Sequence, residues 1–228
     1  KKQVDEALDQ TIAEPEIIPN KKTELADVYA PFENHEIFPE KLQNREIRFI
    51  DAISEAIEIS MKNHPNLVLM GQDIAEYGGA FKITEGFVEK FGKKRVRNTP
   101  LCEAAIVGSG LGLSINGYKS MVEMQFADFV TEGFNQIINN LAKTHYRWNQ
   151  NADVVVRMPT GAGTGAGPFH SQSNEAWFTK TPGLKIAYPA FPDDAKGLLI
   201  QSFEDPNPVL FFEHKKLYRS LKGNVPEG

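Results

Sequence analysis

The sequence predicts an α/β fold, a doubly wound, mostly parallel sheet with helices on both faces. Two observations predict it. Short apolar runs alternate along the chain with longer segments whose apolar residues recur at helical spacing. The short runs are continuously apolar, which is typical of parallel strands buried on both faces. The 228 residues are also enough for a sizeable core.

The first helix and strand are predicted from spacing and from a stop signal. Ile50, Ile53, Ile57 and Met61 recur on one helical face, and the apolar run of residues 66–71 then ends at a glycine. Next, Thr99 precedes a proline, which is a favourable cap followed by a favourable first helical residue. A helix is therefore expected to open at Thr99 and to run through residues 102–115.

The remaining elements continue the alternation. We expect strands at residues 119–125, 153–158, 185–188 and 209–213, and helices at residues 129–146 and 193–203.

The first 46 residues have the composition of a linker. They hold 6 Lys or Arg against 11 Asp or Glu, a net charge of 6 − 11 = −5, which is the whole formal charge of the chain. They contain four prolines and no glycine. We expect residues 1–46 to form an acidic tethering arm in which residues 25–32 dock on the rest, and residues 47–228 to form the domain. The non-methionine start predicts a cut within a longer polypeptide.

Charge and cysteine content exclude several classes. The net charge of −5 gives no basic field for nucleic acid or for an anionic membrane. No apolar stretch reaches the length of a membrane helix. Cys102 is the single cysteine, so no intrachain disulfide can form, and a cytoplasmic protein is expected.

The first glycine cluster lies on the helix of residues 102–115. Ala104, Gly108 and Gly112 are four residues apart and form a strip with almost no side chain. Tight packing in the core, a dimer interface and the approach of a cofactor all explain this strip. Glu103 lies in the first turn, where the helix dipole favours an acid without any chemistry, although its apolar neighbours would desolvate it.

The second cluster, residues 161–167, resembles a dinucleotide loop only in part, because Pro168 follows and no helix opens there. We interpret it as a flexible loop that presents His170 at a strand end, where a catalytic and a structural role both remain open. Phe129 follows the strand of residues 119–125, so it is either a ligand contact or part of the core.

Six segments, taken in order, resemble the β subunit of thiamine-diphosphate-dependent 2-oxo acid dehydrogenases, most closely the branched-chain (2-oxoisovalerate) members. The resemblance runs from Arg48 to Arg219 and covers only the pyrimidine-binding domain. It rests on the segments LCE at 101–103 with Gly108 and Gly112, EMQFADF at 123–129, FHSQS at 169–173, TPGLK at 181–185, DAKGLL at 194–199 and DPNPV at 205–209.

The resemblance implies roles for individual residues. Glu103 would activate thiamine diphosphate by sharing a proton with its aminopyrimidine, and Leu101, Gln125 and Phe129 would also bind that cofactor. His170 would assist acyl transfer to a lipoyl group. A monovalent cation, with potassium expected, would bind oxygen atoms of Ala152, Val154, Val155, Ser202, Asp205 and Asn207.

The resemblance also implies what other parts must supply. The chain has no Gly-Asp-Gly signature for magnesium and diphosphate, so these would be held by an α-type part, and the family's C-terminal domain is missing. The expected partners are that α-type part, a lipoyl-bearing acyltransferase and a 2-oxo acid, in a dimer or heterotetramer. Alone, the chain would be inactive. Ser109 departs from the apolar residue usual in the family.

Two alternatives to this function remain. One is a related enzyme that uses the same cofactor, such as a pyruvate or acetoin dehydrogenase or a transketolase-like synthase. The other is a non-catalytic assembly module in which the glycine strip serves only dimerisation.

Overall fold

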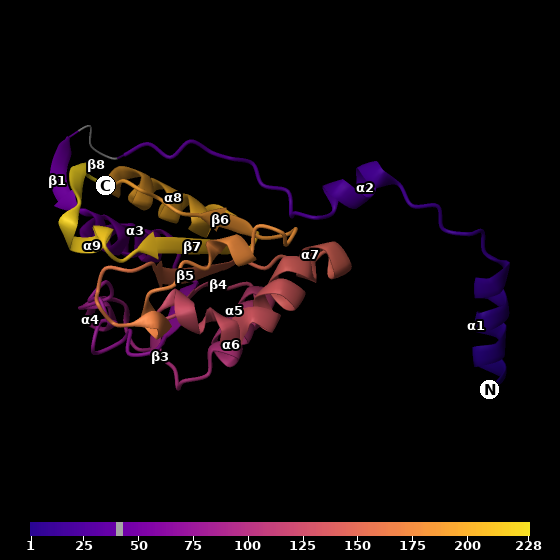
Figure 1. Cartoon of the computed structure of the whole chain (residues 1–228). Coiled ribbons are helices and arrows are strands. Elements are labelled where there is room, and N and C mark those ends of the chain that lie inside the picture. Colours follow the sequence, from indigo (N-terminus) through magenta and orange to yellow (C-terminus); the bar gives the residue numbers. More distant parts are fainter. Residues whose placement is uncertain (40–42) are drawn as a thin grey trace.

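A parallel six-stranded sheet forms the centre of the described chain (Figure 1). The structure is a computed structural model that describes residues 1–39 and 43–228. The strand order is β3-β2-β4-β5-β7-β6, and each neighbouring pair is parallel. The strands are β2 (Leu67–Gly71), β3 (Val96–Asn98), β4 (Lys119–Glu123), β5 (Val154–Thr160), β6 (Lys185–Ala187) and β7 (Val209–His214).

Helices cover both faces of this sheet, as the sequence predicted. On one face lie α3 (Phe49–Asn63) and α8 (Pro192–Glu204), and on the other lie α5 (Glu103–Ile115), α6 (Val130–Asn135) and α7 (Ala142–Trp148) (Figure 1). Short helices α4 (Phe87–Phe91) and α9 (Leu217–Ser220) follow β2 and β7. No helix of the described residues is long and apolar enough to cross a membrane.

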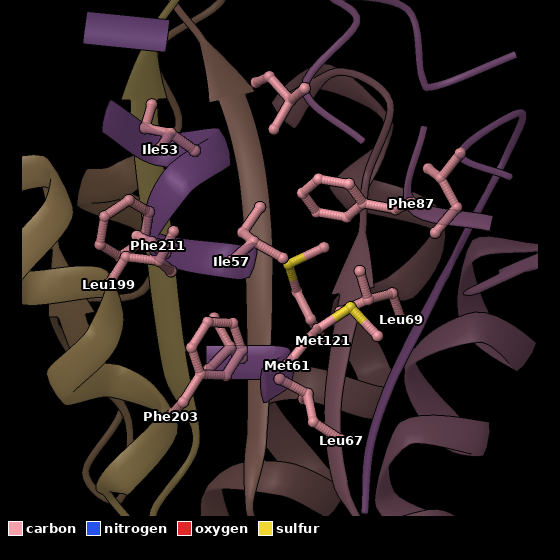
Figure 2. Close-up of a cluster of buried hydrophobic side chains, with 14 of the residues drawn as sticks. Ile53, Ile57, Met61, Leu67, Leu69, Phe87, Met121, Leu199, Phe203 and Phe211 are labelled. Carbon is pink, nitrogen blue, oxygen red and sulfur yellow. The ribbon is translucent and has the colours of Figure 1, made fainter. Parts of the chain in front are cut away.

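Alternate residues of each strand enter opposite cores. Leu67 and Leu69 of β2 join the core beneath α3 and α8, whereas Val68 and Met70 join the core beneath α5 and α6. In the first core, Ile53, Ile57 and Met61 of α3 meet Leu199 and Phe203 of α8 above the strand side chains (Figure 2). Strands buried on both faces therefore explain why their sequence is continuously apolar.

One predicted helix boundary is wrong. Helix α5 begins at Glu103 with Cys102 as its N-cap, and not at Thr99. The Thr99 main-chain N–H donates to the carbonyl oxygen of Gly71 at 2.9 Å, so this residue extends the ladder beside β2 instead of capping a helix. Tertiary hydrogen bonding thus overrides a locally favourable cap.

The predicted helix of residues 129–146 is helical throughout but changes pitch. A 3₁₀ turn, η1 (Ala127–Phe129), leads into α6, and the π-helical η2 (Gln136–Leu141) separates α6 from α7. Ile137 and Leu141 are fully buried, as their spacing predicted. Two further 3₁₀ turns, η3 (Pro168–His170) and η4 (Glu175–Trp177), follow β5.

The N-terminal arm contains structure of its own and docks where the sequence indicated. Helices α1 (Lys2–Ala13) and α2 (Lys21–Ala26) bury no residue, and α1 stands clear of the sheet (Figure 1). Ala30 is buried, and its N–H and C=O pair with the Asn207 side chain at 2.7 and 3.0 Å. The Tyr29 hydroxyl donates to the Leu184 carbonyl at 3.2 Å. The arm then leads to β1 (Asn44–Arg48), which pairs antiparallel with β8 (Lys222–Pro226).

A buried ion group ties the three central strands together. Arg157 of β5 donates to both carboxylate oxygens of Glu213 on β7 at 2.6 Å, and it also pairs with Glu123 at the end of β4. The Tyr218 hydroxyl donates to Glu213 at 2.6 Å. Burial raises the pKa of Glu123 even though Arg157 opposes the rise, and the Glu213 and Glu123 carboxylates raise the pKa of Arg157 against the effect of burial.

Removing the cation of this group should destabilise the fold. Arg157→Met leaves the Glu123 and Glu213 carboxylates buried without a cation, although the Tyr218 hydroxyl still donates to Glu213, so we expect the free energy of unfolding to fall by about 3–5 kcal/mol. Urea unfolding measures this loss. The control is Arg97→Met, at an exposed position on β3, with an expected change within about 0.5 kcal/mol. Equal effects of the two substitutions would contradict a structural role for the ion group.

Removing the Asn207 side chain should release the arm. Asn207→Leu deletes both hydrogen bonds to Ala30, each worth about 1 kcal/mol, so we expect amide exchange at Ala30 to accelerate roughly tenfold or more. Hydrogen exchange followed by NMR measures this rate. Asn116→Leu, at an exposed position after α5, is the control and should leave the rate unchanged. An unchanged rate in Asn207→Leu would show that other contacts hold the arm.

Candidate functional site

The predicted catalytic and cofactor-binding residues lie at the carboxyl edge of the sheet, whereas the predicted cation ligands lie at its amino edge. Parallel strands end at the same edge, and open α/β sheets bind ligands there. Gln72 follows β2, residues 124–129 follow β4, the glycine-rich segment 161–167 follows β5, and Lys215 follows β7. Helix α5 also begins at this level, because Thr99 just before it pairs with the end of β2.

Glu103 lies in the first turn of α5 and has a buried partner. Its carboxylate accepts a hydrogen bond from the Gln72 side-chain nitrogen at 3.0 Å. Gln72 is 5% exposed, and its other polar atom, the side-chain oxygen, is buried and has no partner among the described residues. Sequence reasoning missed Gln72, although a polar residue directly after a buried strand is a usable signal.

Three rings from two segments form an aromatic cluster beside the same edge. The His170 imidazole meets Phe126 and Phe129 edge-on, with centroids 4.7 and 5.4 Å away. Phe126 also meets Phe81 at 5.4 Å. The structure therefore brings together two predicted site residues, Phe129 and His170. The His170 Nδ1 atom is buried with no partner in the described part of the chain.

The loop that carries His170 is held at its two ends. Gly161, Gly163, Gly165 and Gly167 all have positive φ, which only glycine adopts without strain. The Thr160 hydroxyl and the Gly161 N–H both donate to the Gln172 carbonyl, at 3.1 and 2.8 Å. A Cβ at Gly161 would overlap the His214 ring. The loop thus closes on itself directly after β5.

Two buried charges lie beneath the aromatic cluster. The Asp128 carboxylate accepts the main-chain N–H groups of Ser171 and Gln172 at 3.1 and 3.0 Å. The Lys215 ammonium is 5.3 Å from the centre of the Phe126 ring, and burial lowers the pKa of Lys215. Neither residue was predicted as a site residue.

The other predicted contacts are more exposed. Gln125 is half-buried, and Leu101 is 80% exposed just before α5. Helix α5, which begins with Glu103, packs on α6, which follows Phe129 directly. A Cβ built at Gly133 of α6 would lie 3.5 Å from the Glu103 carbonyl oxygen. A groove of about 1050 Å³ lies elsewhere, where arm residues 34–39 pass over α3 and α8.

The glycine strip does not pack in the core. Ala104 is exposed, and nothing lies within 4 Å of a Cβ built at Gly112. The close approach occurs instead at Gly110, where an added Cβ would lie 3.0 Å from Val122 and 3.2 Å from Val154. Core packing is therefore the wrong explanation of Ala104 and Gly112, which face outward.

The predicted cation ligands are buried, and their oxygen atoms are of a type that suits a monovalent cation. Ser202, Asp205 and Asn207 lie at the end of α8, and Ala152, Val154 and Val155 lie at the start of β5. However, Asp205 pairs with Lys185 and accepts two hydrogen bonds from Asn207, at 2.8 and 2.9 Å. Potassium at this position stays a prediction.

Comparison with known proteins identifies the family. A family model described as "Transketolase, pyrimidine binding domain" matches residues 45–220. The chain belongs to this family.

Three similar proteins are each named as the beta subunit of a dehydrogenase. The chain is 48% identical over 180 residues to the 2-oxoisovalerate dehydrogenase subunit beta of Bacillus subtilis, covering 78% of this chain and 55% of that protein. It is 44% identical over 186 residues to the mitochondrial 2-oxoisovalerate dehydrogenase subunit beta 2 of Arabidopsis thaliana, covering 80% and 52%. It is 39% identical over 184 residues to a Staphylococcus aureus pyruvate dehydrogenase E1 component subunit beta, covering 80% and 57%. This chain thus accounts for about half the length of each relative.

A solved structure confirms the fold alone. It is titled "Split gene transketolase, inactive beta4 tetramer", and it matches with a TM-score of 0.59 and 21% identity over 73% of this chain and 50% of that one. The doubly wound architecture predicted from sequence is therefore that of the transketolase pyrimidine-binding family.

The glycine-rich loop of residues 161–167 gives a prediction about stability. Gly161→Ala forces a side chain into a left-handed conformation, at roughly 1–2 kcal/mol, and adds an overlap with His214. Gly165→Ala is the matched control, because its φ is also positive but nothing lies within 4 Å of the added Cβ. Urea unfolding should therefore show a larger loss for Gly161→Ala. Equal losses would show that the loop relaxes away from His214.

Proposed function

We propose that this chain is the pyrimidine-binding half of a thiamine-diphosphate-dependent 2-oxo acid dehydrogenase that acts on a branched-chain 2-oxo acid. One observation carries the proposal: Glu103 opens a helix at the carboxyl edge of the sheet, with its carboxylate fixed by the buried Gln72 side chain. The names of the relatives from Bacillus subtilis and Arabidopsis thaliana support the substrate class.

The residues present fit the proposed cofactor. The aromatic cluster offers ring surfaces for a pyrimidine, and Phe129 is half-buried rather than enclosed in the core. The Gln72 side-chain oxygen and the His170 Nδ1 have no hydrogen-bond partner among the described residues, and a polar heterocycle could satisfy them. Leu101, Glu103, Gln125 and Phe129 would hold the group. When bound, thiamine diphosphate supplies the electron sink that decarboxylation of a 2-oxo acid requires.

Each side chain then has a task of its own. With the cofactor bound, the Glu103 carboxylate would hold the proton shared with a pyrimidine ring nitrogen, and the hydrogen bond from Gln72 fixes the direction of that carboxylate. His170 would supply a proton-transferring imidazole for acyl transfer to the lipoyl group. Phe126 and Phe129 hold the imidazole from two sides, which limits the positions that it can take.

The other half of the site would come from partners. An α-type part, joined through the linker of residues 1–46, would hold magnesium and the diphosphate, and a lipoyl-bearing acyltransferase would receive the acyl group. Exposed apolar side chains at the edge, Leu101 at 80% and Phe169 at 75%, favour such a covering partner. The proposal includes a dimer or heterotetramer in the cytoplasm, a potassium ion in the complete assembly, and no turnover by the 228-residue chain alone.

Two competing functions are distinguishable from this one. A pyruvate dehydrogenase is the closer competitor, but the Staphylococcus aureus relative is 39% identical against 48% for the branched-chain relative. Comparison of kcat/KM for 3-methyl-2-oxobutanoate and pyruvate decides between them. The outward glycine strip favours the other competitor, an assembly module, which would release no heat on titration with thiamine diphosphate even with the α-type part present.

Replacing Glu103 tests the proposal in the enzyme assembled with its α-type part. Glu103→Gln keeps the shape but removes the proton exchange, so we expect decarboxylation to slow by roughly 100-fold or more. Glu132→Gln, an exposed acid in the first turn of α6, is the matched control and should retain full activity. Full activity in Glu103→Gln would refute the proposal.

A further inference from the structure

The motif Phe126-Ala127-Asp128-Phe129 contains a charged residue that the proposed function leaves without a task. Asp128 is 6% exposed in the 3₁₀ turn η1 that follows β4, between the two phenylalanines that contact His170. We infer that Asp128 is a positioning residue that fixes the His170 loop against the edge of the sheet. The consequence for acyl transfer rests on the proposed function, whereas the positioning itself does not.

The loop needs an external anchor. Four glycines with positive φ precede His170, and glycine loses more conformational freedom on ordering than any other residue. The two residues after His170, Ser171 and Gln172, donate their main-chain N–H groups to one oxygen of Asp128 at 3.1 and 3.0 Å. Hydrogen bonds to an ionised carboxylate are about twice as strong as those between neutral groups. The anchor therefore acts directly beside the histidine.

The same short motif holds the ring as well as the main chain. Phe126 and Phe129 meet the imidazole edge-on, at interplanar angles of 89° and 81°. Asp128 lies between them in sequence and holds the residues that follow the imidazole. A single turn of chain after β4 thus restrains both the direction of the His170 side chain and the path of its backbone.

The turn is restrained in return by the segment that follows the loop. The side chain of Asn174, which is fully buried, donates to the Ala127 carbonyl at 2.8 Å. The two segments therefore interlock: Asp128 holds the loop, and Asn174 holds the turn. The Asp128 charge is also attracted by the buried ammonium of Lys215, which accounts for a carboxylate at this depth.

The second oxygen of Asp128 is buried and has no partner in the described part of the chain. A residue that served packing alone would not require an acceptor with spare capacity at this depth. An asparagine would retain an acceptor for the two N–H groups but lose the charge, whereas an alanine would lose both. This difference separates positioning by hydrogen bonds from simple filling of space.

NMR of the full 228-residue chain tests the inference without any cofactor. In Asp128→Ala, we expect amide exchange at Ser171 and Gln172 to accelerate at least about tenfold, and the His170 ring resonances to lose the shifts caused by Phe126 and Phe129. Asp128→Asn, which keeps an acceptor but loses the charge, should show a smaller acceleration of about threefold at the same two amides and retain most of the ring shifts. The Val155 amide in the central strand should keep its rate, which separates loop release from global unfolding. Glu132→Gln controls for the loss of a nearby charge.

Two results would overturn the inference: wild-type exchange at Ser171 and Gln172 in Asp128→Ala, or an equal defect in Asp128→Asn and Asp128→Ala. If Asp128→Ala does not fold, Asp128→Asn carries the test, with an expected acceleration of about threefold at the same two amides. Wild-type exchange there would also overturn the inference.

The assembled enzyme separates positioning from the proposed function. There, Asp128→Ala should slow acyl transfer to the lipoyl group at least about tenfold more than it slows decarboxylation, and Asp128→Asn should restore most of it. If His170→Ala leaves acyl transfer intact while Asp128→Ala still frees the loop, the role proposed for His170 fails and the positioning by Asp128 stands.

Discussion

The buried Arg157 guanidinium is the constraint on which the carboxyl edge depends. It bridges Glu123 and Glu213 from the two strands beside its own, and Tyr218 of α9 completes the group. Charges at this depth are tolerated only when they are paired and hydrogen-bonded, so the three strand ends hold one another in register. The segments that carry Phe129, His170 and Lys215 leave from these same strands, and the site rests on this rigid base.

At the carboxyl edge of the sheet, several buried polar atoms lack a hydrogen-bond partner among the described residues. Gln72, Asp128, His170 and Asn174 each have a buried polar atom with no partner among the described residues, and all four lie on segments that follow β2, β4 or β5. Native proteins leave few such atoms without an explanation. Their concentration at one edge, beside exposed apolar side chains, is what a surface completed by another molecule would show.

Sequence reasoning succeeded where the signal was local and periodic. The apolar spacing of α3 and the continuous runs of β2, β5 and β7 follow from burial on one helical face or on both strand faces. It failed where a contact with a residue distant in sequence determines the local structure. Thr99 pairs with Gly71 instead of capping a helix, and Gly110 rather than Gly112 meets the sheet because the rotation of α5 is set by packing.

The same contrast holds for the site. Glu103, Phe129 and His170 were indicated by motifs, but Gln72 and Asp128 act through contacts with residues 31 to 44 positions away. The spacing of residues along the sequence does not indicate which of two such distant residues will be in contact. The π-helical segment η2 was equally hidden, because the apolar spacing of its residues is compatible with an ordinary helix.

The docking of Ala30 has a geometrical consequence. Asn207 precedes β7, so it lies at the amino edge of the sheet, on the far side from Glu103, and the arm crosses α8 to reach β1 (Figure 1). The chain that precedes Ala30 therefore leaves the domain at the edge opposite Glu103. A segment ahead of Ala30 reaches the carboxyl edge only if it spans the full length of the strands.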